Sequence, residues 1–421
     1  MQEWLWKSAA DLGRAIGAGQ IDPVALAETY LAAISEHPQR DRIYARTTQD
    51  RALAEAHAAR QRAATGHRLS LLDGVPISWK DLFDTAGAAT EAGSALLAGR
   101  MPAADALVLR NATQMGLVCL GKTHMTELAF SGLGVNPVTA TPPNVHNPAL
   151  APGGSSSGAA TSVAFGLAAA GIGSDTGGSV RVPSAWNDLV GLKTTAGRVS
   201  LQGVVPLCAR FDTVGPLCRT VEDAALIFAA LEGRRAPDLR DAPDAAYRSA
   251  LDRLRAAGAE IVALDAPEVA EAMALAPTLF APEAYGQWHE QIEAAPHLMH
   301  QQVLERFRGG ATVSGPEFVS AWLKLDQLRQ TWAARVAGFD AVLLPATPNL
   351  PPDVARLESD AQYFVTENLL TLRNTRIGNL LGLSAVTLPT GVPSCGIMLM
   401  GQSMGEDRLL RMAAAAEAAL A

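Results

Sequence analysis

Apolar and polar positions along the chain follow two patterns, one typical of strands and one typical of helices. The segment 72–79 places Val75, Ile77 and Trp79 at every second position, which predicts a strand that ends at Lys80. Short apolar runs predict further buried strands, at 117–120, 167–173, 341–344 and 385–388.

Helical segments separate these strands, and several begin at capping residues. Ser8 can cap a short first helix, and Asp22 before Pro23 opens a second helix that runs to about Glu36. Thr220 is the expected N-cap of a later helix. Other helices are expected at 50–64, 104–115, 158–165 and 405–421. Strands that alternate with helices predict an α/β fold with a layered sheet.

The chain contains no internal repeat and no long linker, so residues 1–421 are expected to form a single domain. The segment 237–338 is mostly helical in pattern, with polar faces. Because strand-forming sequence stands on both sides of it, this segment is expected to be an insert within the domain.

Charge and composition exclude several classes of protein. The net charge is −8 and no Lys/Arg-rich run occurs, which argues against a nucleic-acid partner. The four cysteines form no CxxC pair and the eight histidines show no HExxH spacing, so we expect reduced thiols, no bound metal and no cofactor. The first residues resemble neither a signal peptide nor a membrane anchor, which favours a cytoplasmic protein away from membranes.

Two motif matches do not fit their structural context. Residues 116–123 match the P-loop pattern GxxxxGK[ST], but the four positions between the glycines are Leu, Val, Cys and Leu, which are typical of a strand rather than a phosphate-binding loop. Residues 154–158 match the GxSxG pattern of α/β-hydrolases. That motif needs a strand directly before it, and 147–152 contains two prolines. We therefore expect neither a nucleotide site nor an α/β-hydrolase elbow.

Two Ser/Gly-rich segments, 152–158 and 173–183, flank one predicted helix and one predicted strand. This path can bring both segments to the same end of a sheet. In the second segment, Gly177 and Gly178 leave successive backbone N–H groups uncovered, as an oxyanion hole requires. Ser179 follows directly and is placed to attack a carbonyl carbon.

A serine nucleophile needs a base, because its hydroxyl is weakly nucleophilic. The nearest histidine, His146, lies in a Pro/Asn-rich loop and has no obvious partner carboxylate. Lys80 is the alternative, since a lysine can act as a base when burial keeps it neutral. Trp79 is compatible with such burial, but a lysine at a strand end is ordinarily a solvated surface residue, so the local sequence leaves the base open.

Together, these segments resemble the signature of the amidase signature family. The resemblance rests on Gly74-Val75-Pro76 with Lys80-Asp81, on Pro152-Gly153-Gly154-Ser155-Ser156, on 173–183 and on 191–194, and the spacing between the two serine segments matches. Similar stretches occur at 121–123, 212–216, 219–223, 379–383 and 388–389, so the resemblance covers essentially the whole chain. It implies a single α/β domain whose central mixed β-sheet is covered by helices on both faces.

The resemblance also implies a Ser-Ser-Lys triad. Ser179 would form the acyl-enzyme and Lys80 would be the neutral base. Ser155 would relay protons between them, and a cis peptide bond between Gly154 and Ser155 would hold it in position. The implied oxyanion hole consists of the backbone N–H groups of Thr176, Gly177, Gly178 and Ser179. Asp175 and Arg181 would support this loop as a pair. Phe130, Ser131 and Gly132 would face the acyl group of the substrate. Core packing is the alternative for Phe130, and a surface salt bridge is the alternative for the Asp175–Arg181 pair.

The expected function is hydrolysis of a C–N amide bond in a small molecule. One alternative is a ureide hydrolase similar to allophanate or carboxybiuret hydrolases, which bind small carboxylated substrates and can need a small partner protein. Another is the glutaminase subunit of a tRNA-dependent amidotransferase, but those subunits are generally longer and carry an Arg-Arg-Ile-Met-Leu-Gly stretch. Here the helical insert reads Leu-Glu-Arg-Phe-Arg-Gly at 304–309. The sequence does not identify the substrate, and a homodimer is one expected oligomeric state.

Overall fold

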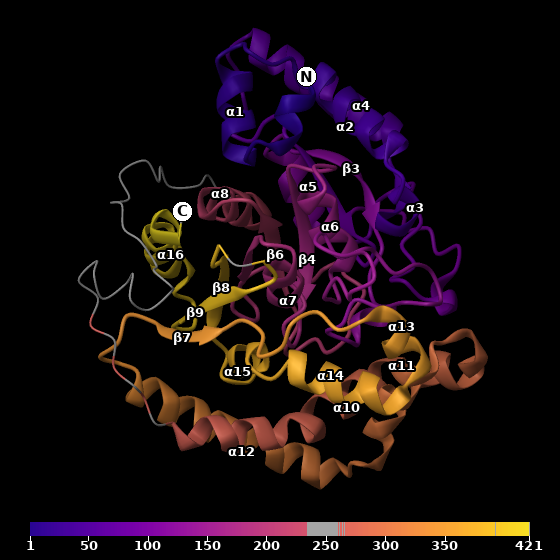
Figure 1. The fold of residues 1–421 in the computed structure, drawn as a ribbon, viewed down its shortest axis with the longest axis vertical. Helices are drawn as coiled ribbons and strands as arrows, with labels where there is room; N and C mark the ends of the chain where they lie inside the picture. Colours follow the sequence, from indigo (N-terminus) through magenta and orange to yellow (C-terminus); the bar gives the residue numbers. More distant parts are fainter. Residues whose placement is uncertain (234–259, 261, 263, 265, 392, 421) are drawn as a thin grey trace.

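The computed structural model describes residues 1–421 apart from 234–259, 261, 263, 265, 392 and 421. Within this part of the chain, nine strands form one mixed sheet in the order β1-β3-β2-β4-β6-β5-β8-β9-β7 (Figure 1). The strands are β1 Tyr44–Thr47, β2 Pro76–Lys80, β3 Val118–Thr123, β4 Ala170–Asp175, β5 Val190–Lys193, β6 Thr213–Cys218, β7 Val342–Pro345, β8 Ser384–Pro389 and β9 Gly396–Gly401. Strand β2 pairs in parallel with both β3 and β4, and the other pairs are antiparallel.

Helices pack against both faces of this sheet and extend beyond its β7 edge (Figure 1). They are α1 Ala9–Gly17, α2 Pro23–Glu36, α3 Arg40–Ile43, α4 Gln49–Ala64, α5 Leu107–Gln114, α6 Ser157–Ala164, α7 Arg181–Trp186, α8 Val221–Glu232, α10 Pro267–Ala294, α11 Gln301–Arg308, α12 Gly315–Arg335, α13 Val354–Ser359, α14 Ala361–Thr371, α15 Thr375–Leu380 and α16 Glu406–Leu420. The predicted α/β fold with a central mixed sheet is confirmed.

Side-chain caps fix the starts of several helices where the sequence predicts them. The side chain of Ser8 accepts a hydrogen bond from the Asp11 N–H at the start of α1, and Asp22 caps α2 in the same way. Thr220 accepts from the N–H of Asp223 at the start of α8. These caps satisfy N–H groups that the first turn of a helix leaves without partners.

The sequence pattern misses four strands, β1, β5, β6 and β9. Strand β6 is the clearest case, because it contains Gly215 and Pro216 although it lies between β4 and β5 inside the sheet. Proline lacks a donor for the ladder, so it argues against a central strand in a sequence. Strand β7 was expected to be buried, but it lies at the sheet edge and its residues are partly or fully exposed.

Helices α10, α11 and α12 occupy most of the segment predicted as an insert, and they lie together along the lower side of the molecule (Figure 1). The part of that prediction from 237 to 259 falls outside the described residues. The division of the chain into one domain with an insert stays a prediction.

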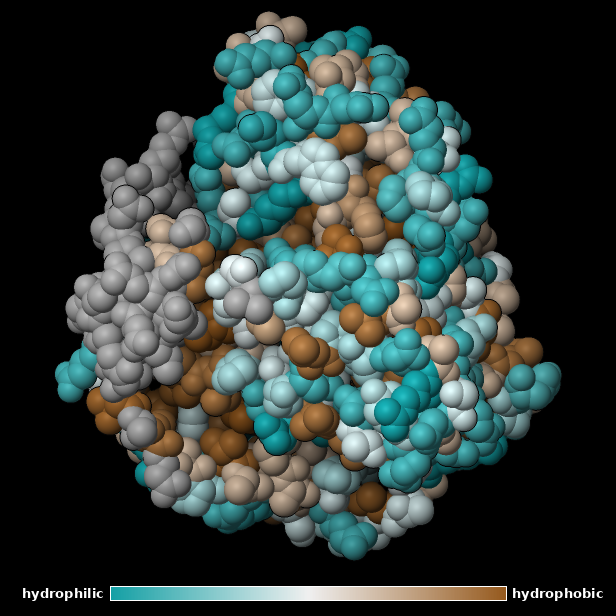
Figure 2. All heavy atoms as spheres, viewed as in Figure 1, coloured by the Kyte–Doolittle hydropathy of each residue, from teal (hydrophilic) through white to brown (hydrophobic). Residues whose placement is uncertain are grey.

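The face shown in Figure 2 is mostly hydrophilic over the N-terminal helices at the top of the view. In the described part of the chain, none of the helices combines the length and the apolar character that a bilayer crossing requires.

Candidate active site

Lys80 ends β2 and lies beside two serine hydroxyls. Its Nζ is 2.7 Å from the Ser155 Oγ and 2.8 Å from the Ser174 Oγ. Ser155 precedes α6 and Ser174 lies in β4, the strand that pairs in parallel with β2. The two serine segments lie at one end of the sheet, as the sequence predicts, and the parallel pairing of β2 with β4 brings Lys80 to the same end.

Burial favours the neutral form of the Lys80 amine near neutral pH. Its side chain is fully buried, and this desolvation lowers the pKa of Lys80 to about 7, although the charges of Asp175 and Asp212 oppose the shift. A lysine with this pKa is substantially neutral at physiological pH and can accept a proton. The surface position that a strand-end lysine ordinarily takes does not apply here.

Backbone contacts join the two serine segments. The peptide bond between Gly154 and Ser155 is cis. The N–H of Ser156 donates to the carbonyl of Ser179 at 3.2 Å, and the Ser156 hydroxyl donates to the carbonyl of Ser174. The loop before α6 is thereby attached to the loop after β4, so the positions of Ser155 and Ser179 depend on each other.

Asp175 and Arg181 form a buried ion pair under the Ser179 loop. Arg181 Nη2 lies 2.8 Å from Asp175 Oδ1 and its Nε lies 2.9 Å from Oδ2, a two-pronged pairing. Both side chains are buried, and the Arg181 charge helps to hold the pKa of Asp175 well below its ordinary value against the effect of burial. The guanidinium also donates to Asn379 Oδ1 and to the carbonyl of Thr375, so the pair connects this loop to α15 and is not a surface salt bridge.

The oxyanion donors need one correction. The N–H of Gly178 donates to Asp175 Oδ1 at 2.9 Å, so it is occupied and does not face a substrate oxygen. Among the described residues, the N–H groups of Thr176, Gly177 and Ser179 have no such partner. Gly178 serves the loop in another way, because its φ is +139° and a Cβ there would lie 2.1 Å from Thr375 Oγ1.

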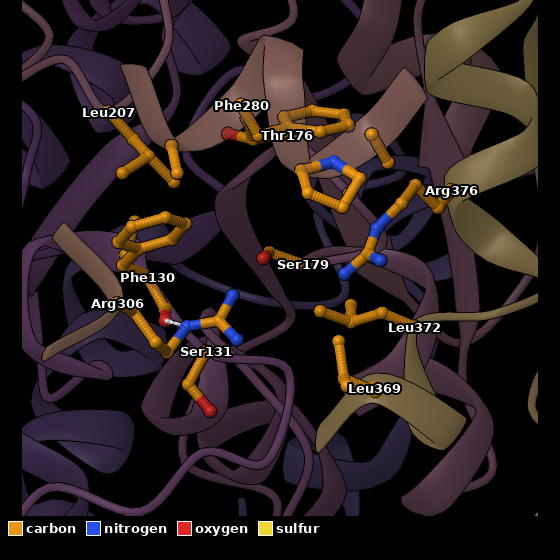
Figure 3. Close-up of a pocket in the computed structure, with 15 residues that line it drawn as sticks. Phe130, Ser131, Thr176, Ser179, Leu207, Phe280, Arg306, Leu369, Leu372 and Arg376 are labelled. Carbon is orange, nitrogen blue, oxygen red and sulfur yellow. Dashed lines mark hydrogen bonds between the residues drawn. The ribbon is translucent and has the colours of Figure 1, made fainter. Parts of the chain in front are cut away.

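Ser179 opens into a cavity of about 190 Å³ (Figure 3). The ring of Phe130 lines this cavity, packs edge-on against Phe307 and belongs to the core as well. Ser131 lines the cavity, but its hydroxyl donates to Asn368 Oδ1. Gly132 is not part of the cavity wall. Its N–H also donates to Asn368, and a side chain there would meet Leu372.

Lys122 of the rejected P-loop match and His146, the histidine considered as a base, both lie away from the cavity at Ser179. Lys122 of the P-loop match is buried in β3, where its Nζ donates to Thr90 and pairs with Asp81 at 3.1 Å. The expectation that His146 has no partner carboxylate is wrong, since its Nε2 lies 2.8 Å from Asp188 Oδ2. That pair is partly exposed and does not line the cavity at Ser179, so His146 is not placed to act as its base.

Comparisons with known proteins agree with this geometry. A family model described as Amidase matches residues 25–245 and 237–410. The chain is 35% identical to the 2-amino-5-chloromuconic acid deaminase of Comamonas testosteroni, over 95% of this chain and 93% of that protein. It is 31% identical to one of the subunits of the Glutamyl-tRNA(Gln) amidotransferase of Anaeromyxobacter sp. (strain K), over 97% of this chain and 95% of that protein. A solved crystal structure of an amidase superposes with a TM-score of 0.86 at 26% identity, over 97% of this chain and 98% of that one.

The chain belongs to the amidase family. The resemblance noted in the sequence is thereby confirmed, and the amidase hydrolyses amide C–N bonds. Small molecules with an amide group suit such an enzyme.

Several residues of the amidase site escape sequence reasoning. Ser174 contacts Lys80 directly, and Asp212 accepts a 2.5 Å hydrogen bond from Thr176 Oγ1 in the Ser179 loop. Ser174 stands inside a recognised motif, so its strand position could have signalled a role. Arg306 of α11 and Arg376 of α15 line the cavity of the amidase from distant parts of the chain, and no local pattern marks either one.

Proposed function

We propose that the amidase works through a Ser-Ser-Lys triad in which Ser179 is the nucleophile, Ser155 relays protons and Lys80 is the base. The observation that carries this proposal is the 2.7 Å contact between the Lys80 Nζ and the Ser155 Oγ, formed by a fully buried lysine. Ser179 stands on the adjoining loop, with its side chain directed into the cavity (Figure 3). In the described residues the Ser179 hydroxyl has no hydrogen-bond partner, and contacts of this kind often form only with substrate in place.

The first half of the proposed reaction forms the acyl-enzyme on Ser179. Ser179 Oγ attacks the amide carbon while its proton passes by way of Ser155 to Lys80. The carbonyl oxygen gains negative charge, and the N–H groups of Thr176, Gly177 and Ser179 are the donors that we assign to it. The C–N bond then breaks, and the proton returns through Ser155 to the leaving nitrogen.

Water completes the reaction by attacking the Ser179 ester. Lys80 takes a proton from that water by the same route, the ester C–O bond breaks, and Ser179 regains its proton. The products are a carboxylic acid and an amine or ammonia. Asp175 and Arg181 take no part in proton transfer in this scheme, and they hold the loop that carries the nucleophile.

Replacing the nucleophile tests this assignment. Ser179→Ala is expected to reduce kcat on any accepted amide by about 10³-fold or more, because covalent catalysis is lost. Ser157→Ala is the matched control. Its hydroxyl is buried at the start of α6 and has no hydrogen-bond partner among the described residues, so activity should stay within a few-fold. Both variants should show wild-type circular dichroism, and substantial turnover by folded Ser179→Ala would refute the assignment.

The glutaminase and ureide alternatives are separated by substrate. A glutaminase subunit would release ammonia from glutamine and depend on its partner subunits, and a ureide hydrolase would prefer ureides over simple amides. The relation to an amidotransferase subunit keeps the first alternative in the test. We also infer a homodimer in the cytoplasm, which light scattering and cell fractionation would examine.

A further inference from the structure

Two arginines face the Ser179 hydroxyl from opposite sides of the cavity (Figure 3). Arg306 extends from α11 beneath Phe130, and Arg376 extends from the start of α15 beside Leu372. Their guanidinium groups both point toward Ser179 in the close-up, so two fixed positive charges border the place where the reacting carbonyl must lie.

Neither arginine has an acidic partner among the described residues. Arg306 donates its Nε to the carbonyl of Phe130 at 2.9 Å and lies over that ring, with 4.6 Å between the guanidinium carbon and the ring centroid. The guanidinium carbon of Arg376 lies 5.8 Å from the ring centroid of Phe280. The Arg376 side chain makes no hydrogen bond within the described residues. Arg181, by contrast, is fully paired with Asp175. The terminal N–H donors of Arg306 and Arg376 therefore remain available to a ligand.

Keeping Arg306 and Arg376 charged without acidic partners destabilises the protein. Burial, together with repulsion from Arg376, lowers the pKa of Arg306 to about 9, and burial lowers the pKa of Arg376 to about 10. Charged groups in a partly desolvated site are normally paired or hydrogen-bonded. A cavity that keeps two such cations without acids is suited to an anion.

We propose, on the basis of the proposed Ser179 site, that the substrate is a small amide that carries a carboxylate, and that Arg306 and Arg376 bind it. Guanidinium groups match carboxylates because they present paired N–H donors in a plane. The rest of the wall is largely apolar, including Phe130, Phe280 and Leu372, and suits a short carbon chain between the carboxylate and the amide.

The cavity also indicates what the substrate lacks. None of the described residues that line it is Asp or Glu, so nothing there would pair with an ammonium group. An amino-acid amide such as glutamine carries both a carboxylate and an ammonium group, and the second would lie near two arginines. The volume of the cavity, about 190 Å³, is somewhat above the ~150 Å³ of a cavity that holds a single benzene ring. This volume favours a short substrate.

Three amides of equal chain length test the proposal. Glutaramate has an amide at one end and a carboxylate at the other, pentanamide lacks the carboxylate, and glutamine adds an ammonium group. We expect the wild-type enzyme to prefer glutaramate over both by at least about tenfold in kcat/KM, since a charge-assisted hydrogen bond contributes that much or more. A preference for pentanamide or glutamine would overturn the proposal, as would equal rates. Malonamate, succinamate and adipamate extend the series, and failure of every carboxylated amide while neutral amides are hydrolysed would also overturn it.

Arginine variants connect the preference to the two side chains. Arg376→Met should lower kcat/KM for carboxylated amides by about 10- to 100-fold more than it lowers kcat/KM for pentanamide. Arg306→Lys keeps the positive charge but loses the paired N–H donors of the guanidinium group. Its loss of kcat/KM for carboxylated amides should therefore be smaller than that of Arg376→Met. Arg373→Met is the matched control, because Arg373 is exposed, close to Arg376 in sequence, and outside the cavity wall. An equal loss on charged and neutral amides in Arg376→Met would refute a carboxylate-binding role.

Binding without turnover separates this proposal from the triad. Glutarate, the product from glutaramate, should bind the wild-type and Ser179→Ala enzymes in calorimetry and bind Arg376→Met at least tenfold more weakly. Labelling of Ser179 by a neutral sulfonyl fluoride should persist in Arg376→Met, which shows that the nucleophile is intact. If Ser179→Ala stays active, the proposed function fails. If labelling persists and no dicarboxylate binds, the carboxylate site alone fails.

Discussion

At the residue scale, the burial of Lys80 sets the pH at which its amine becomes neutral. Its ammonium group would lie in a fully buried position beside two hydroxyls, and burial favours the neutral amine. Lys193 is buried to the same degree and also has a pKa lowered to about 7, through desolvation and the nearby charge of Arg181. A lowered pKa alone therefore does not identify a base, and the contact with Ser155 is the reason we propose Lys80.

The pH dependence of kcat/KM should follow Lys80. Below a pH of about 7 the lysine is protonated and cannot accept a proton, so kcat/KM should fall tenfold for each pH unit and level off above that value. Lys80→Met should remove about 10²–10⁴-fold of the activity at any pH. The profile is measured with a neutral amide, whose charge does not change over the range.

Lys193→Met provides the matched control for this profile. The Lys193 Nζ donates to the carbonyl of Thr194 and contacts neither Ser155 nor Ser179, so the inflection near pH 7 should survive in this variant. Loss of the inflection in Lys193→Met, or a flat wild-type profile down to pH 5, would contradict a Lys80 base.

At the scale of elements, Glu127 attaches the helical segment to the body of the domain. It lies in the 3-10 turn Glu127–Ala129 and is fully buried. One carboxylate oxygen accepts from the Ser94 hydroxyl, and the other accepts from the N–H of His300 at the start of α11. Helix α11 carries Arg306, so this contact helps to place one wall of the cavity.

Glu127 also gives a prediction for stability against pH. Burial raises the pKa of Glu127 to about 7, so the folded state holds a proton that the unfolded state releases above about 4.5. The stabilising effect is complete below that lower value and is lost as the pH rises to about 7. The wild type should lose about 1–3 kcal/mol of unfolding free energy relative to Glu127→Gln across this window, measured by urea denaturation.

The control for Glu127 is an exposed carboxylate on the nearby helix α11. Glu305→Gln changes an exposed side chain of α11 and should show the wild-type dependence on pH. If Glu127→Gln and Glu305→Gln behaved alike, Glu127 would not be the group that titrates.

The whole molecule combines contributions from distant parts of the sequence into one cavity. Ser179 follows β4, Phe280 comes from α10, and Arg376 comes from α15 near the C-terminus. The predicted single domain therefore implies that the cavity and the sheet unfold together. Tryptophans report on both regions, with Trp79 and Trp186 in the sheet region and Trp288 and Trp332 in the helical segment.

Urea titration followed by two probes examines this prediction. Tryptophan fluorescence and hydrolytic activity should be lost with the same midpoint, because coincident transitions indicate one cooperative unit. Activity lost at clearly lower urea than the main change in tryptophan fluorescence would mean that the cavity comes apart before the rest of the chain, against a single cooperative domain.

Local sequence carried enough information for much of the fold. Helix α2 begins and ends where the pattern from Asp22 to Glu36 predicts, because its cap and its proline act locally. Strand β6 could not be predicted, since Gly215 and Pro216 oppose a central strand and only pairing with β4 and β5 places them in one.

The sequence by itself pointed to the residues that we propose for the chemistry. Lys80, Ser155 and Ser179 each stand in a short motif that resembles a family signature, and such a motif can be read from the residues alone. The tertiary structure alone decided that Lys80 is desolvated and that the N–H of Gly178 is taken by Asp175. It also decided that Arg306 and Arg376 line one cavity with Ser179, since the effect of one charge on another depends on their distance in space and leaves no mark in local sequence.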